Sequence, residues 1–94
     1  LIQENADPEV KFDFIQFFER LVPASSSPEM SYLTHTYEGP DDMQAHIKSG
    51  LLPTTLSIPV ENGEMALGIW QGVYLVEHRT SSRRREIIAS LLSV

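Results

Sequence analysis

Apolar residues recur with helical spacing near the start of the chain. Five of them share one face of a helix with 3.6 residues per turn: Val10, Phe14, Phe17, Phe18 and Leu21. Just before them, Asp7-Pro8-Glu9 combines a capping side chain, a proline suited to the first turn and an acid that complements the helix dipole. The pattern predicts a helix from here to Pro23. Its apolar stripe is broad, which predicts that more than one side of it is covered.

A second helix is predicted further along the chain. Residues 24–31 read as a polar loop, and residues 32–38 are either a short strand or an extended loop. After Gly39-Pro40, either Asp41 or Asp42 caps a helix that runs to Gly50. Asp42 and His46 lie four residues apart and therefore share one face of this helix.

The rest of the chain has the alternation of β-strands. Residues 55–60 alternate, and Asn62-Gly63 is the pair preferred in two-residue hairpins. An apolar phase then continues over residues 65–77, which predicts one long strand. Residues 86–93 are predicted to form a last strand, although their spacing would also suit a helix. The class is α+β, with a largely antiparallel sheet and helices.

Length and composition exclude several classes of protein for this chain. The 94 residues make one domain, and no apolar run is long enough to cross a bilayer, so no membrane contact is expected. There are no cysteines, which excludes disulfides and thiolate metal ligands. The net charge of −6 argues against nucleic-acid binding, although Arg83-Arg84-Arg85 forms a local basic cluster. That cluster is either a solvated turn or a phosphate site.

The chain opens on Leu1-Ile2 without an initiator methionine. We therefore expect it to be a piece of a longer protein, in which any targeting signal would lie upstream. The lack of cysteine and of a visible signal favours a cytoplasmic location.

Imidazoles and carboxylates are densest where the second helix begins. The residues concerned are His35, Glu38, Asp41, Asp42 and His46. Imidazole with carboxylate suits zinc, and carboxylates with water suit magnesium, but the spacing matches no known zinc signature. The alternative is that an aspartate caps the helix, Glu38 is solvated and the histidines are ordinary surface or packing residues.

Two further polar positions interrupt apolar stretches. Glu77 falls in the apolar phase of the predicted long strand, where a buried carboxylate would need Arg79, an arginine of residues 83–85 or a metal as its partner. The alternative there is an ion pair at the edge of a sheet. Gln71 follows Trp70 and is a candidate for a polar site or a subunit interface.

Several motifs resemble those of one family. They are Gln3-Glu4-Asn5-Ala6-Asp7-Pro8, Arg20-Leu21-Val22-Pro23, His35-Thr36-Tyr37-Glu38-Gly39-Pro40-Asp41-Asp42-Met43, Ala45-His46-Ile47-Lys48-Ser49 and Gly68-Ile69-Trp70-Gln71-Gly72. In this order they resemble the YjbQ-like family, also called the secondary thiamine-phosphate synthase family, along essentially the whole chain. Two positions depart from the family pattern: Ile69 stands where Thr or Ser is usual, and Gln3 where Asn is usual. The family also has an upstream His-Thr-Ser segment, so the single domain 1–94 is expected to be incomplete at its N-terminus.

The resemblance implies a fold, an assembly and an activity. The fold is α+β, with largely antiparallel sheets packed as a sandwich and two helices outside, assembled as a homotrimer. The activity joins a pyrimidine methyl diphosphate to a thiazole phosphate and releases pyrophosphate, so that a small phosphorylated metabolite is the expected partner. The alternative is a non-catalytic trimeric protein that binds a metal or a metabolite.

Residue roles follow from this implied chemistry. A divalent metal, Mg²⁺ or Zn²⁺, would be held by His35, His46, Asp41 and Asp42. His46, His35 and Glu38 are the catalytic candidates. The candidates for substrate binding are Lys48, Gln71, Arg79 and Asn5.

Overall fold

The first helix forms where the apolar spacing predicts it. In the computed structural model, which describes residues 1–4 and 6–93, α1 spans Pro8–Leu21. The Asp7 side chain accepts a hydrogen bond from the Glu9 backbone N–H at 2.9 Å, which satisfies one of the free N–H groups of the first turn. The helix ends at Leu21, and the N–H of the next residue, Val22, donates to the Phe18 carbonyl; Pro23 has no N–H with which to continue the helical hydrogen bonding.

The second predicted helix is also present, as α2 over Asp42–Leu51. A single 3-10 turn, η1 at Pro28–Met30, lies in the loop between the helices. The backbone of residues 32–38 is a loop with turns at both ends rather than a strand. Asp41 precedes α2 but makes no capping hydrogen bond with its side chain. Its carboxylate binds residues from the other end of the chain instead, as described below.

The strands form two small antiparallel sheets. β1 (Ile2–Glu4) pairs with β4 (Gln71–Val73), with Gln3 opposite Gly72. β2 (Val60–Glu61) and β3 (Glu64–Met65) form the predicted hairpin. The turn residues Asn62 and Gly63 have φ values of 52° and 78°, the left-handed conformation that such a two-residue turn requires.

The predicted strands over residues 65–77 and 86–93 are wrong in the structure, and the strand predicted over residues 55–60 is present only at Val60. Of residues 65–77, only Met65 in β3 and the three residues of β4 are strand, because a turn separates the two. In that turn, the Gln71 N–H donates to the Gly68 carbonyl at 3.0 Å and the Gly68 N–H donates to Gln71 Oε1 at 2.7 Å. Residues 55–59 and 86–93 are not in strands, since no described segment pairs with them along a ladder.

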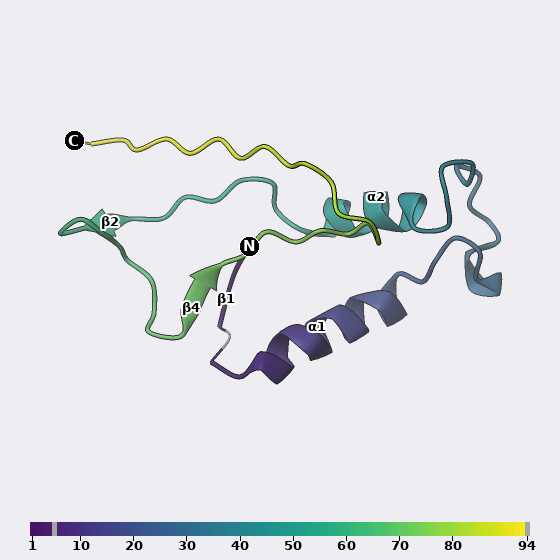
Figure 1. Ribbon diagram of the computed structural model, residues 1–94, viewed down its shortest axis with the longest axis horizontal. Coiled ribbons are helices and arrows are strands. Elements are labelled where there is room, and N and C mark those ends of the chain that lie inside the picture. Colours follow the sequence, from purple (N-terminus) through teal and green to yellow (C-terminus); the bar gives the residue numbers. More distant parts are fainter. Residues whose placement is uncertain (5, 94) are drawn as a thin grey trace.

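The two helices and two sheets of the described residues confirm the α+β class, in an open arrangement (Figure 1). The sheets are separate two-stranded pairs rather than the packed sandwich that the resemblance implies. The molecule measures 52 × 28 × 20 Å, with a radius of gyration of 16.5 Å where about 12 Å is typical of a compact chain of this length. Among the described residues, Val22 and Met30 alone form the buried apolar core.

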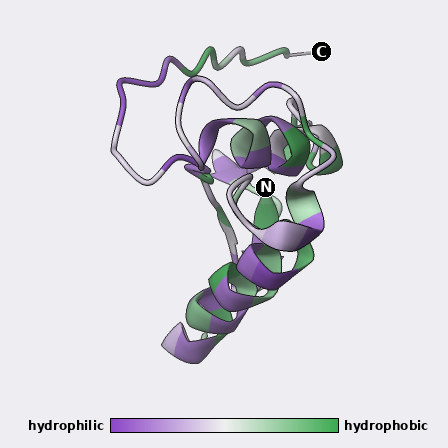
Figure 2. Cartoon of the chain, turned by 90° about the vertical axis from the view of Figure 1, so that its right-hand side faces the viewer, coloured by the Kyte–Doolittle hydropathy of each residue, from purple (hydrophilic) through white to green (hydrophobic). Residues whose placement is uncertain are grey.

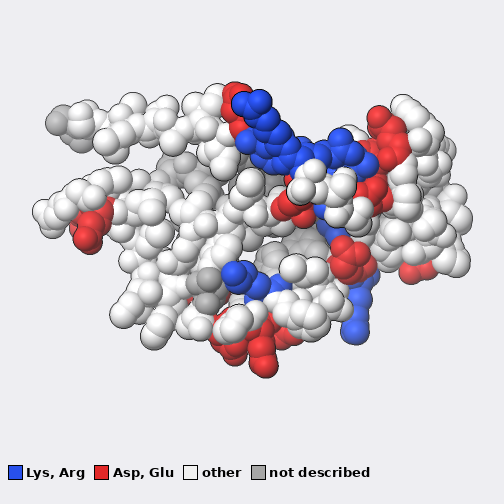
Figure 3. Space-filling model, viewed as in Figure 1, with Lys and Arg blue, Asp and Glu red and all other residues white. Residues whose placement is uncertain are grey.

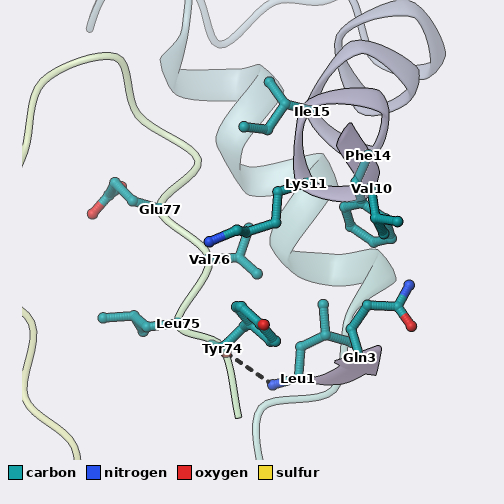
Figure 4. A pocket seen from close by; sticks show the side chains of 10 residues that line it. All are labelled: Leu1, Gln3, Val10, Lys11, Phe14, Ile15, Tyr74, Leu75, Val76 and Glu77. Atoms are coloured by element: carbon teal, nitrogen blue, oxygen red, sulfur yellow. Dashed lines mark hydrogen bonds between the residues drawn. The ribbon is translucent and has the colours of Figure 1, made fainter. Parts of the chain in front are cut away.

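Much of the apolar surface therefore stays exposed. α1 has no buried residue, and Figure 2 shows hydrophobic positions along α1 and towards the C-terminal end of the chain. Between α1 and residues 74–77 lies an apolar cavity of about 190 Å³, lined in part by Val10, Phe14 and Tyr74 (Figure 4). No described helix is both long enough and apolar enough to span a membrane.

Candidate functional site

Two histidines and two acids converge at the start of α2. We call this set the His–carboxylate cluster: His35, Glu38, Asp42 and His46. One ligand atom from each of the four lies within 4.8 Å of all the others. His35 Nε2 lies 3.0 Å from both Glu38 Oε2 and Asp42 Oδ2, and His46 Nε2 lies 3.4 Å from Asp42 Oδ2. The two imidazoles therefore lie side by side, with ring centroids 5.5 Å apart.

Local sequence explains the convergence. Asp42 and His46 face the same way because they are one helical turn apart on α2. His35 and Glu38 come from the preceding loop, which turns at Gly39 with a φ of 104°. A side chain at Gly39 would be strained at this φ, and its Cβ would lie 3.2 Å from Asp41 Oδ1. Glycine therefore allows the loop to return onto the helix.

Arg79 fixes the acidic side of the cluster. Its Nε donates to Asp41 Oδ2 at 3.0 Å, its Nη1 to Asp42 Oδ1 at 2.8 Å and its Nη2 to the Glu38 carbonyl at 3.3 Å. The Arg79 side chain is only 17% exposed. A forked guanidinium is suited to such simultaneous contacts, so Arg79 orients the acids rather than being directed at solvent.

Asp41 lies beside the cluster without joining it. Its Oδ2 accepts hydrogen bonds from the Thr80 N–H at 2.9 Å and the Thr80 hydroxyl at 3.1 Å in addition to that from Arg79. These donors, the Thr80 N–H foremost, hold the pKa of Asp41 well below its usual range. Asp41, a predicted metal ligand, is thus hydrogen-bonded to Arg79 and Thr80. The group of residues that could hold a metal ion contains Glu38 in its place.

Asp42 connects the two sides of the site. It is 6% exposed, and burial on its own raises its pKa, but the hydrogen bond from His35 and the charges of His46 and Arg79 lower it overall. Its Oδ1 binds Arg79, and its Oδ2 faces both imidazoles. The carboxylate therefore stays charged and aimed at the cluster.

The predicted substrate-binding residues are scattered. Lys48 is 3% exposed, and its Nζ lies 2.6 Å from Glu19 Oε1, away from the cluster. Gln71 is in β4, where its side chain closes the turn at Gly68. Arg79 is at the site, but in the positioning contacts above. Asn5 lies outside the described residues.

Glu77 has one of the predicted partners. Arg85 donates to both of its carboxylate oxygens at 2.7 Å, and the Arg79 N–H donates to Oε1 at 3.0 Å. Arg85 first, and then the Arg79 N–H, lower the pKa of Glu77 to about 2. This is an ion pair outside any strand, so the edge-of-sheet alternative is wrong in its location.

A hollow of about 390 Å³ adjoins the cluster and shares Asp42 and His46 with it. We call it the basic hollow, and its other charged or imidazole lining residues are Glu77, His78, Arg79, Arg83 and Arg85. In Figure 3 the largest group of basic side chains lies in the upper part of the view with acidic side chains at its edges, and smaller basic groups lie below it. From the sequence, Glu77 is connected to Arg79 and to residues 83–85 only as a candidate ion-pair partner, and Arg83-Arg84-Arg85 is on its own the candidate phosphate site. Sequence reasoning missed Thr80, for which the only signal was its position next to Arg79.

The donor set suits a divalent transition metal. Two imidazole nitrogens and two carboxylate oxygens are ligands that zinc accepts, and a tetrahedral ion with bonds of about 2.0–2.1 Å needs its ligand atoms about 3.3 Å apart. The observed separations of 3.0 and 3.4 Å about Asp42 Oδ2 are close to that value. The ligand atoms that lie further apart, by as much as 4.8 Å, must approach one another by up to about 1.5 Å to hold such an ion.

Comparison with known proteins gives a consistent result. The family model described as "UPF0047 protein YjbQ-like" matches residues 1–94. The chain is 47% identical over 90 residues to the UPF0047 protein YjbQ of Escherichia coli O157:H7, covering 96% of this chain and 62% of that protein. It is 49% identical over 88 residues to the UPF0047 protein sll1880 of Synechocystis, covering 94% and 57%.

A more distant relative extends the range of organisms. The UPF0047 protein MJ1081 of Methanocaldococcus jannaschii is 40% identical over 91 residues, covering 97% of this chain and 59% of that protein. The chain thus spans about three fifths of the length of these relatives. No solved structure matches it.

Proposed function

This chain belongs to the YjbQ-like UPF0047 family, and on that premise we propose that its His–carboxylate cluster is a divalent-metal centre acting on a small phosphorylated metabolite. The observation that carries the proposal is the placing of four ligand atoms within 4.8 Å of one another, at the edge of a hollow lined by arginines. Metal and guanidinium groups together are the usual means of binding and stabilising phosphate charge.

Each residue of the cluster has a role in this proposal. His35, His46 and Asp42 hold the ion, and Glu38 either completes the shell or exchanges for a ligand oxygen, since it is the more exposed of the two acids. Arg79 keeps Asp42 oriented through Oδ1. In metal sites, such supporting partners fix the geometry of the ligands.

The proposed reaction is the formation of thiamine phosphate. A ring nitrogen of the thiazole phosphate forms a C–N bond to the methylene carbon of the pyrimidine methyl diphosphate. The C–O bond to the diphosphate breaks, and pyrophosphate leaves with the electron pair. A bound divalent ion supplies charge stabilisation for the departing pyrophosphate. The basic hollow, next to His46 and Asp42, is where the diphosphate would lie.

A non-catalytic metal-binding protein is the second candidate, and the donor count favours it. Catalytic zinc sites keep one position open, whereas sites with four protein ligands are closed and structural. Here the protein supplies four donors. The two candidate functions therefore differ in one point. In the enzyme, Glu38 leaves the ion when a phosphorylated ligand binds, whereas in the binding protein it remains on the ion.

We also propose a homotrimer, as the resemblance implies. The support is the large apolar surface left uncovered in one chain, including Phe17 at 61% and Leu21 at 54% exposure on α1. Association would remove such surface from water, the main favourable contribution to most protein interfaces.

The test combines metal analysis with an assay. The full-length protein is purified without chelator, its metal content is measured, and thiamine-phosphate formation is followed with and without added Mg²⁺ or Zn²⁺. We expect about one ion per chain, lost in His46→Ala and retained in the matched helix variant Asp13→Asn, which changes an exposed acid of α1. Product formation that disappears with the ion supports the enzyme. A retained ion with no product in any condition supports the binding protein.

Two results would contradict the proposal as a whole. One is the absence of a stoichiometric ion both in the purified protein and after titration with Zn²⁺ or Mg²⁺. The other is metal binding that is as strong in His46→Ala as in the unchanged protein.

A further inference from the structure

The basic hollow has a charge balance that favours anions. Its lining includes the guanidinium groups of Arg79, Arg83 and Arg85, opposed by the carboxylates of Asp42 and Glu77. The imidazoles of His46 and His78 also line the hollow. Burial, followed by the charge of Lys48, lowers the pKa of His78, so that its ring is neutral at physiological pH. The three arginines and two carboxylates of the lining alone carry a formal charge of +1.

The three arginines differ in how firmly they are held. Each of the three guanidinium nitrogens of Arg79 donates a hydrogen bond to a different residue, and the side chain is 17% exposed. Arg85 is 44% exposed, and its guanidinium has one partner residue, Glu77. Within residues 1–4 and 6–93, the Arg83 guanidinium makes no hydrogen bond or ion pair. Arg83 and Arg85 are therefore the groups that could take up a ligand.

The Glu77–Arg85 contact has the form of a bound oxyanion. Two parallel N–H groups of Arg85 meet the two oxygens of Glu77, each at 2.7 Å, which is the geometry with which arginine also binds phosphate. Such pairs contribute little net stability where water reaches them, and both side chains here are partly exposed. A phosphate group carries more charge than a carboxylate and can compete for the same fork.

Displacement would not leave Glu77 without a donor. Its Oε1 also accepts the Arg79 backbone N–H at 3.0 Å, and this contact is independent of Arg85. Glu77 can therefore release Arg85 and remain hydrogen-bonded and hydrated. The exchange needs rotation of two side chains and no rearrangement of a helix.

We propose that Glu77 is an internal occupant of an oxyanion site: the phosphoryl group of a small phosphate or diphosphate ester takes its place on Arg85, with Arg83 as the second cation. This deepens the proposed function and rests on it only in that the site opens onto the His–carboxylate cluster through Asp42 and His46. Glu77 then acts as a built-in competitor, which weakens the binding of poorly charged ligands.

The test uses inorganic pyrophosphate and inorganic phosphate as probes, titrated calorimetrically into the full-length protein. Because pyrophosphate itself binds metals, the metal content is measured before and after each titration. We expect Glu77→Gln to bind pyrophosphate about three- to tenfold more tightly than the unchanged protein. Glu86→Gln, which removes the same charge nine residues away and does not line the hollow, should stay within twofold.

The arginines provide a second comparison within one tripeptide. Arg85→Gln should weaken pyrophosphate binding at least tenfold, and Arg83→Gln about threefold or more. Arg84→Gln is the matched control, since Arg84 does not line the hollow, and its affinity should remain within twofold. Circular dichroism and thermal melting establish that each variant is folded before it is titrated.

The outcomes divide cleanly. Equal affinity of Glu77→Gln and the unchanged protein overturns the proposal, and so does an equal loss in Arg84→Gln and Arg85→Gln, which would indicate diffuse attraction to the segment. A separate Zn²⁺ titration distinguishes this failure from that of the proposed function. If Zn²⁺ does not bind but the arginine variants change pyrophosphate affinity as expected, the oxyanion site is supported and the proposed metal centre is contradicted.

Discussion

At Asp42, one carboxylate receives contacts from three stretches of chain. It belongs to α2, its Oδ2 meets His35 from the preceding loop, and its Oδ1 meets Arg79, which is 37 residues further on. The cluster therefore depends on a contact that neither helix spacing nor a local motif contains. Arg79 acts through Asp42 and is a positioning residue.

Replacing Arg79 tests this role. In Arg79→Gln the fork that holds Asp41 and Asp42 is lost, and we expect metal affinity to fall by about 10- to 100-fold, as for other partners that orient metal ligands. Arg79→Lys keeps the charge but not the fork, and should recover part of the loss. Zn²⁺ titration by calorimetry provides the measurement. Full recovery in Arg79→Lys would mean that charge alone matters.

A pH dependence follows from Glu77. Its pKa falls from the ordinary 4.5 to about 2 on folding, so the unfolded chain binds more protons over this range. The stabilisation by the Glu77–Arg85 pair is therefore present in full above pH 4.5 and is lost as the pH falls towards 2. Because the pair is partly exposed, we expect Glu77→Gln to lower the melting temperature by at most about 5 °C at pH 7. The difference should vanish near pH 2, and a difference that is constant across pH would contradict the assignment.

At the scale of elements, a buried lysine joins the two helices. Lys48 of α2 reaches Glu19 of α1, and Gln44 donates to Glu19 at 3.1 Å and to the Val22 carbonyl at 2.6 Å. Lys48 and Gln44 are each 3% exposed. These contacts hold α2, and with it Asp42 and His46, at a fixed position relative to α1.

The two ends of this ion pair should respond differently to mutation. Glu19→Ala leaves the buried Lys48 ammonium without its acid, and we expect a loss of about 2–3 kcal/mol in the free energy of unfolding. Lys48→Met replaces the charge with an apolar chain of similar size and frees a half-exposed acid to water, so the loss should stay below about 1 kcal/mol. Urea denaturation measures both, with Asp13→Ala on the exposed side of α1 as control. Equal losses at the two positions would contradict this account.

The elements also show what sequence could predict. Asp7-Pro8 and Asn62-Gly63 determine α1 and the hairpin through local geometry, and both predictions are confirmed. Lys48 could not be placed, because its partner Glu19 lies 29 residues away. The strand over residues 65–77 was wrong because apolar alternation ignores the turn that Gly68 and Gln71 form with each other. β1 pairs with β4 although the two strands are far apart in the sequence, and no local sequence pattern predicted this pairing.

For the whole molecule, the chain leaves a surface that one copy cannot bury. The rings of Phe14 and Phe18 of α1 pack against each other at a tilt of 41°, with centroids 4.9 Å apart, while Phe17 beside them is 61% exposed. The apolar face that the sequence predicts for α1 is therefore present, but much of it remains exposed to solvent in a single chain. Exposed apolar residues in such number are typical of interaction surfaces.

A charge on this face should disrupt the proposed trimer. We expect the full-length protein to have three times its subunit mass by light scattering after size-exclusion chromatography, and Phe17→Asp to shift it to the single-chain mass, since association would bury an unpaired carboxylate. Gln16→Asp adds the same charge at the neighbouring position of α1, which is exposed and polar, and should leave the mass unchanged. A single-chain mass for the unchanged protein at tens of micromolar would contradict the trimer. A Phe17→Asp protein that keeps the triple mass would mean that the α1 face lies outside the subunit contact, so that the apolar surface of residues 86–93 becomes the place where the contact must be sought.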